Sequence, residues 1–268
     1  MFKRDGHIHS PYCPHGSTDT FVQYIERAIQ LGFKEITFTE HAPLPAPFID
    51  TTPTKDSSMT IEQMEEYLKE VQEIKEIYYN QLKINVGLEV DYIEGYETEI
   101  RDFLSKWGHL LDDSILSVHF LLNGKNHHYD CVDYSPEHFQ EMIGAYGGID
   151  AIYECYYNTI LKSILADLGQ NKPKRIGHIT LANKFQILYP PTNDFREKIV
   201  AILKQIKHSG YTLDYNAAGL KKPYCLEPYP PDWVIEEAKK LHIPLVYGSD
   251  AHQAKDLGQG YNLLVDRI

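Results

Sequence analysis

Hydrophobic and polar residues follow two different spacings along this chain. In three segments the apolar residues recur every three or four positions, which predicts helices with one buried face. The first segment ends before Gly32, the second begins with a capping-box pair, Thr60 and Gln63, and the third ends before Gly210. The three predicted helices cover residues 21–29, 60–74 and 195–206.

Between the helical segments lie short apolar runs that predict strands. There are seven of them, around Ile8 and over residues 35–39, 84–90, 115–118, 175–179, 212–215 and 245–247. Strands that alternate with helices favour a parallel sheet, either open or closed into a barrel. In such barrels the functional residues lie at the carboxyl ends of the strands.

Composition limits the possible functions. The 268 residues contain no repeat, low-complexity tract or obvious linker, so we expect one globular domain. A net charge of -12 argues against nucleic-acid partners and anionic membranes, because both attract basic surfaces. No apolar stretch approaches the ~18 residues of a membrane span, and the N-terminus lacks the apolar core of a signal peptide. The four cysteines form no CxxC pair, which indicates reduced thiols in a cytoplasmic protein.

The strongest local motif is His7-Ile8-His9. Residues two apart on a strand point to the same side, so these two imidazoles can face one metal ion. His15 follows after a short turn. Taken alone, the motif fits a pair of exposed strand histidines as well as it fits a metal site.

The other candidate residues share one position, at or just past the end of a predicted strand. They are His41, Glu89, His119, His178, Asp250 and His252. A single histidine in such a place is more often structural, but chance would also scatter histidines over the helices. A buried carboxylate is costly unless it is paired or binds a metal, which favours a site role for Glu89 and Asp250. Six histidines in loops or on helix faces are interpreted as structural: His109, His127, His128, His138, His208 and His242.

Nine nitrogen and oxygen ligands are too many for one four-coordinate zinc ion. They suit two or three divalent ions with a bridging carboxylate, and imidazole with carboxylate suits Zn, Mn or Fe. The ligands come from distant parts of the chain, unlike the compact spacing of a structural zinc finger. The pattern therefore indicates a catalytic metal cluster.

These motifs resemble those of the polymerase-and-histidinol-phosphatase (PHP) superfamily. The resemblance rests on residues 5–10, 39–41, 87–89, 117–119, 177–178 and 248–252. It implies a single α/β domain over residues 1–268, folded as a distorted, TIM-like (β/α)7 barrel. Residues 214–220 and 227–230, with the segment after His41, resemble the stand-alone histidinol-phosphate phosphatases more specifically.

Carried over residue by residue, the resemblance implies three metal positions, the first two of which share Glu89 as a bridge. The first would use His7, His9, Glu89 and Asp250, the second Glu89, His119 and His178, and the third His15, His41 and His252. The implied reaction is hydrolysis of L-histidinol phosphate to L-histidinol and phosphate, in histidine biosynthesis, by a hydroxide held between metal ions. The cofactors would be three divalent ions (Zn, Mn or Fe), and the partner would be a small phosphorylated substrate.

Several roles around the metals are also expected. Arg175, three residues before His178, is a candidate catalytic phosphate clamp, because a guanidinium matches two phosphate oxygens. Its structural alternative is a strand-start residue that faces solvent. Asn216 is expected to contact the substrate, and Asp5 to orient His7 or His9. Asp250 or His252 is a candidate for protonating the leaving group.

Three other functions remain to be weighed. Another PHP phosphoesterase would act on a different phosphomonoester or on nucleic-acid ends, although the acidic charge argues against nucleic acid. A regulatory module would bind metal without hydrolysing any ester. A barrel hydrolase of amide bonds would need a different acid–base arrangement. The sequence does not determine the oligomeric state.

Overall fold

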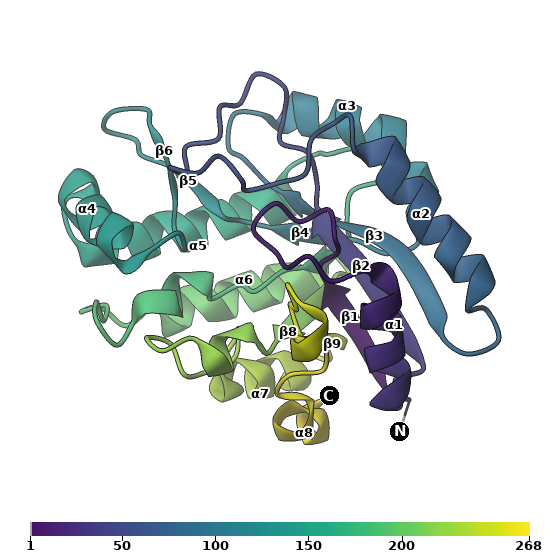
Figure 1. Ribbon diagram of the computed structural model, residues 1–268. Helices are drawn as coiled ribbons and strands as arrows, with labels where there is room; N and C mark the ends of the chain where they lie inside the picture. Colours follow the sequence, from purple (N-terminus) through teal and green to yellow (C-terminus); the bar gives the residue numbers. More distant parts are fainter. Residues whose placement is uncertain (1) are drawn as a thin grey trace.

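The strands of the structure, a computed structural model that describes residues 2–268, form one parallel sheet and one small hairpin (Figure 1). All seven strands predicted from the sequence are present. The large sheet has the order β1-β2-β3-β4-β7-β8-β9. Its strands are β1 (Arg4–Ile8), β2 (Glu35–His41), β3 (Lys83–Asp91), β4 (Ile115–Ser117), β7 (Arg175–Ile176), β8 (Thr212–Asn216) and β9 (Leu245–Gly248).

The two ends of this sheet meet and close a ring. Ile8 forms a parallel bridge with Ala251, and the His9 amide donates to the Ala251 carbonyl at 3.0 Å. The Asp250 amide donates to the His7 carbonyl at 2.8 Å. The closure uses residues past the end of β9, and β7 is only two residues long, so the ring is irregular. The expected distorted, TIM-like α/β barrel is confirmed.

Helices cover the outside of the ring (Figure 1). They are α1 (Phe21–Gln30), α2 (Met64–Ile77), α3 (Glu97–Trp107), α4 (Pro136–Tyr146), α5 (Ile149–Leu165), α6 (Arg196–His208), α7 (Asp232–Lys240) and α8 (Tyr261–Leu264), with short 3-10 turns η1 (Gly108–Leu110), η2 (Leu181–Phe185), η3 (Ala218–Lys221), η4 (Ala254–Asp256) and η5 (Val265–Arg267). Within residues 2–268, none of these helices has the length and apolar character needed to cross a bilayer.

The helix boundaries follow local signals. Helix α1 begins at a capping box formed by Thr20 and Gln23 and ends before Gly32, whose φ of +77° favours glycine. The predicted capping box of α2 forms only in part. The Thr60 amide donates to the Gln63 side chain at 2.9 Å, but the α-helix starts later, at Met64.

An antiparallel hairpin, β5 (Phe120–Leu122) with β6 (Tyr129–Cys131), was not predicted from the sequence. Phe120 packs edge-on against Phe48, with ring centroids 5.0 Å apart, in a small cluster separate from the main core. The hairpin directly follows His119, and it carries the next residues of the chain to the rim of the barrel.

Candidate metal centre

The strand-end residues predicted to bind metal gather at one end of the barrel. His41 and Glu89 are register partners on β2 and β3, and His7 lies within β1. The remaining donors follow the carboxyl ends of their strands. His9 and His15 come after β1, His119 after β4, His178 after β7, and Asp250 and His252 after β9.

Glu89 lies at the middle of the cluster and presents its two oxygens to different histidines. Its Oε2 lies 3.3 Å from His7 Nε2 and 3.3 Å from His41 Nδ1. Its Oε1 lies 2.9 Å from His178 Nε2 and 3.9 Å from His119 Nε2. A carboxylate placed in this way can bridge two ions.

Asp250 contacts two histidines, His7 of β1 and His9, the residue after this strand. Its Oδ1 lies 3.1 Å from His9 Nε2 and 3.7 Å from His7 Nε2. The His252 ring stacks on the His9 ring, with centroids 3.9 Å apart. Both Asp250 and His252 therefore belong to the cluster, as the sequence suggested.

The third group of donors contains a residue that the sequence reasoning left out. Potential ligand atoms of His9, Cys13, His41 and His252 all lie within 4.8 Å of one another. The His15 ring is close to this group, 5.1 Å from His41 and 5.0 Å from His252 between centroids. Cys13 was interpreted only as a free thiol, because its sequence context contains no second cysteine.

The outward-facing nitrogens of three histidines are held by carboxylates, and none of these carboxylates was predicted. His7 Nδ1 lies 2.9 Å from Asp214, and His119 Nδ1 lies 2.7 Å from Asp91. His9 Nδ1 lies 3.4 Å from Glu40. Such contacts fix the tautomer and turn the second nitrogen toward a metal. A signal was present in the sequence, because Asp91 is two residues from Glu89 on one strand.

Two of the nitrogens that face Glu89 lack hydrogen-bond partners. Among the described residues, His7 Nε2 and His41 Nδ1 are buried without a hydrogen bond. Two ligands of one tetrahedral zinc ion lie about 3.3 Å apart, since each is about 2.0–2.1 Å from the metal. The spacings around Glu89 Oε2 match that value. The donors therefore fit divalent ions.

The electrostatics of the cluster call for added positive charge. Burial alone would raise the pKa of Glu89, but the charge of His7 and the hydrogen bond from His178 outweigh it and hold that pKa well below its usual range. Burial would lower the pKa of His9, yet hydrogen bonds to Asp250 and Glu40 raise it to about 9. Burial and the neighbouring His9 lower the pKa of His252, which keeps its lone pairs available. Divalent cations would supply the charge that a proton on His9 otherwise provides.

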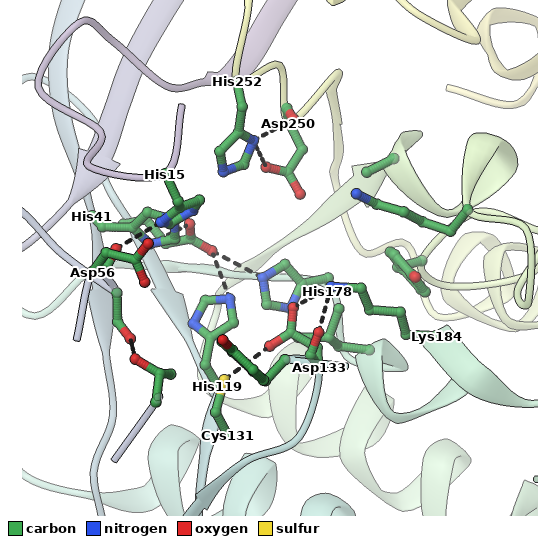
Figure 2. Close-up of a pocket in the computed structure, with 18 of the residues that line it drawn as sticks. His15, His41, Asp56, His119, Cys131, Asp133, His178, Lys184, Asp250 and His252 are labelled. Carbon is green, nitrogen blue, oxygen red and sulfur yellow. Dashed lines mark hydrogen bonds and ion pairs between the residues drawn. The ribbon is translucent and has the colours of Figure 1, made fainter. Parts of the chain in front are cut away.

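The cluster opens into a cavity of about 680 Å³. Figure 2 shows His41, His119, His178 and Asp250 facing it, with Lys184 and Asp133 on one wall. His7 and His9 lie beneath, fully buried. The arrangement offers potential metal donors at the base of the cavity and polar side chains on its walls, which suits a small polar ligand.

Arg175 is not in this cavity, which contradicts its expected role as a phosphate clamp. It lies at the amino end of β7, 2% exposed inside the barrel, and Nη2 donates to Asp113 at 2.7 Å. A Cβ at Gly6 would lie 2.3 Å from its Nη1, so the glycine makes room for the guanidinium. The structural alternative, a solvent-facing residue, is wrong too.

Asn216 and Asp5 also differ from expectation. Asn216 is fully buried, and its side-chain amide donates to Asp250 at 3.0 Å, so it supports a metal donor and is not exposed to substrate. Asp5 accepts the Ser249 amide at 2.9 Å and the Gly258 amide at 3.2 Å. It therefore holds backbone in place and does not bond the imidazole rings. Burial raises the pKa of Asp5 to about 6.

A parallel barrel with a histidine and carboxylate cluster at the carboxyl ends of its strands defines a class of metal-binding α/β barrel proteins. Comparison with known families identifies the particular one. The PHP domain matches residues 5–218, and a PHP-associated segment matches residues 234–268. The chain belongs to the PHP domain family.

Individual relatives agree with this assignment. A histidinol-phosphatase of Bacillus subtilis is 51% identical over the whole of both chains. A crystal structure from Listeria monocytogenes, assigned as a histidinol phosphatase, has a TM-score of 0.93 and 41% identity and covers 97% of this chain and 99% of its own. A Lactococcus lactis histidinol phosphate phosphatase, crystallised with zinc, L-histidinol and phosphate, shares the fold at a TM-score of 0.68 and 20% identity, over 99% of this chain and 94% of its own.

Proposed function

We propose that this protein is a histidinol-phosphatase, a phosphoric monoester hydrolase that converts L-histidinol phosphate to L-histidinol and phosphate. The observation that carries the proposal is the position of Glu89, whose two oxygens face separate histidine sets at the base of a cavity large enough for a small ester. The relative at 51% identity over its full length supports the choice of substrate.

The metal assignment is part of this proposal. His7, His9, Glu89 and Asp250 would hold one ion, and Glu89, His119 and His178 a second. His15, His41 and His252 would hold a third. The converging donor atoms support the first two positions directly, since two of the four potential ligand groups among the described residues fall within these sets, one with His7, His9 and Glu89 and one with Glu89, His119 and His178. When bound, Zn, Mn or Fe would supply Lewis acidity and an activated water.

The third position has two candidate donor sets, because Cys13 lies as close to His9, His41 and His252 as a ligand would. We assign His15, whose ring centroid lies 5.1 Å from that of His41 and 5.0 Å from that of His252. Burial raises the pKa of the Cys13 thiol, whereas a bound cation would lower it. Cobalt substitution tests this assignment. No thiolate-to-cobalt absorption band is expected, and a band that disappears in Cys13→Ser would make Cys13 a ligand.

The protein's own residues prepare the site in three ways. Asp214, Asp91 and Glu40 hold imidazole rings so that the second nitrogen of each faces inward. The Ser117 hydroxyl donates to Glu89 Oε1 at 2.6 Å and fixes that carboxylate. Phosphoryl transfer asks the protein mainly for this kind of positioning and for charge stabilisation.

We also propose that the phosphatase unit spans residues 1–268. Asp250 and His252 lie in the PHP-associated segment, so the site needs both matched segments. The four free cysteines are consistent with a reducing, cytoplasmic location.

The decisive experiment is steady-state hydrolysis after reconstitution with Zn, Mn or Fe, together with elemental analysis. L-histidinol phosphate should be hydrolysed with a kcat/KM at least about 100-fold above that for p-nitrophenyl phosphate, and a single-stranded oligonucleotide should not be cut. Equal rates on both esters would indicate a phosphoesterase of another specificity. Bound metal with no turnover of any ester would indicate a binding module.

A further inference from the structure

The cavity wall beside the cluster carries one partly buried lysine. Of the described residues, three lysines line the cavity, Lys184, Lys221 and Lys222, and no arginine does so. The Lys184 side chain is 19% exposed, whereas that of Lys221 is 59% exposed and pairs with Asp256 at the rim. Lys184 is therefore the more enclosed of these two lysines and the better placed to contact a phosphate dianion inside the cavity.

Among the described residues, the Lys184 ammonium is hydrogen-bonded only to Asp133, and it also lies over the Phe185 ring, 5.9 Å from the centroid. Its ammonium donates to the Asp133 carbonyl at 2.6 Å and to Asp133 Oδ2 at 2.8 Å (Figure 2). An ammonium group has three N–H donors, so one is left over. Because both of these acceptors belong to Asp133, they hold the ammonium from one side, and the third donor is free for a ligand in the cavity.

The position of Lys184 is fixed by the surrounding fold. It belongs to η2, the short turn that begins three residues after His178. Leu181, Ala182 and Phe185 of the same turn are buried in the main core. Asp133 follows the β5–β6 hairpin, and the Cys131 thiol donates to its Oδ1 at 3.3 Å. The cation is therefore presented by packed elements rather than by a free loop.

The pair remains ionised. Burial alone would lower the pKa of Lys184, but the charge and hydrogen bond of Asp133 outweigh it and raise that pKa. Burial would raise the pKa of Asp133, yet the charges of Lys184 and His119 hold it below its usual range. Lys184 and Asp133 line the same cavity as His119, His178 and Asp250.

We propose that Lys184 binds a phosphoryl oxygen of the substrate, and that Asp133 is the positioning residue that aims its ammonium. This inference rests on the proposed function, and it gives Lys184 the task that the buried Arg175 is unable to perform. In this scheme Asp133 acts through Lys184, because its carbonyl and its Oδ2 both accept hydrogen bonds from that ammonium.

The test uses inorganic phosphate as the probe, with metal-loaded protein and calorimetry. Lys184→Met should weaken phosphate binding roughly 10- to 100-fold, the usual range for a hydrogen bond to a charged group. Lys184→Arg should recover most of that loss. Lys221→Met is the matched control at the rim and should stay within twofold of the wild type. Metal content of every variant is measured in parallel.

A second comparison separates phosphate binding from recognition of the alcohol. If Lys184 binds the phosphoryl group, Lys184→Met should raise KM by a similar factor for L-histidinol phosphate and p-nitrophenyl phosphate. Asp133→Asn keeps the cation but loosens it, so it should give a smaller loss of the same kind. Asp133→Asn also tests the inference if Lys184→Met does not fold.

Two results would overturn the inference. Unchanged phosphate affinity in Lys184→Met, with a KM raised only for L-histidinol phosphate, would assign Lys184 to the histidinol moiety. Unchanged values throughout would make the Asp133–Lys184 pair structural. Calorimetry measures phosphate binding and requires no turnover. If the wild type failed to hydrolyse L-histidinol phosphate, the proposed function would be wrong, but the effect of Lys184→Met on phosphate affinity would still test this inference.

Discussion

Charged residues are buried at both ends of the barrel, but their charges are neutralised in different ways. At the amino ends of the strands Arg175 lies 2.7 Å from Asp113, and Arg4 lies 3.3 Å from Glu35. Each of these two arginines therefore has a carboxylate partner. At the carboxyl ends, nitrogens and oxygens that all carry lone pairs face one another.

This difference indicates what each end requires. The amino end, which we call the floor, is neutralised by the protein itself. The carboxyl end, the mouth, has donors that only external cations can satisfy together. Asp214 connects the two, with Oδ2 on His7 and Oδ1 3.9 Å from Arg175. Substitutions at the mouth should therefore change metal content, and those at the floor should change stability.

The largest effect is expected from Glu89→Gln at the mouth. Loss of the bridging carboxylate should lower kcat by about 1,000-fold or more, because water activation and charge stabilisation both depend on the bound ions. Metal content should fall while the circular dichroism spectrum stays native. Glu35→Gln is the matched control at the floor, where Asn85 and Arg4 contact the carboxylate. Full activity in Glu89→Gln would refute the bridge.

Arg175→Met should act on the floor alone. It removes the buried guanidinium from Asp113, which keeps Arg4, and from Asp214, which keeps His7. The loss should therefore be at most about 3–5 kcal/mol, the cost of breaking a buried pair. Denaturant unfolding should show that loss, whereas metal stoichiometry and KM of the folded fraction should stay near wild type. A raised KM with unchanged stability would restore the phosphate-clamp interpretation.

Asp91→Asn should have an intermediate effect at the mouth. Asp91 holds His119 Nδ1 at 2.7 Å, and removing such a contact typically costs about 10–100-fold in metal affinity or activity. Competition with a chelator measures the affinity. Asp130→Asn, on the nearby hairpin, is the control and should leave metal affinity unchanged. Equal losses in the two variants would indicate a general structural effect.

The smallest effect concerns pH and the floor. Burial lowers the pKa of Lys172 from 10.5 to about 8. Between these values the unfolded chain keeps the proton that the folded protein releases, so this residue makes stability rise with pH from about 8 to 10.5 and destabilises the protein below about 8. Tyrosines also titrate there, so the measurement is the difference between the wild type and Lys172→Met in denaturant titrations. Parallel pH profiles would contradict the assignment.

The sequence predicted the strands and most of the mouth because both depend on local pattern. His41 and Glu89 each follow or end an apolar run, and parallel strands bring their carboxyl ends to one edge. Arg175 was misplaced because it starts its strand. At about 3.3 Å per residue, three residues put it roughly 10 Å from the level of His178.

The wall of the cavity was beyond prediction for a different reason. Lys184 and Asp133 are 51 residues apart, and they meet only because a hairpin and a 3-10 turn pack together. Neither element has a strong periodic signature, since each strand of the hairpin is only three residues long. Asn216 was correctly placed at a strand end, but its orientation depends on Asp250, which lies 34 residues further along the chain.

The closure of the ring has a consequence for how the enzyme is made. His9 and Asp250 are 241 residues apart along the chain, and they meet only when Ala251 reaches Ile8. A nascent chain therefore carries His7 and His9 without this carboxylate until Asp250 has been synthesised. Metal loading of the complete site should follow the joining of β1 to the segment after β9.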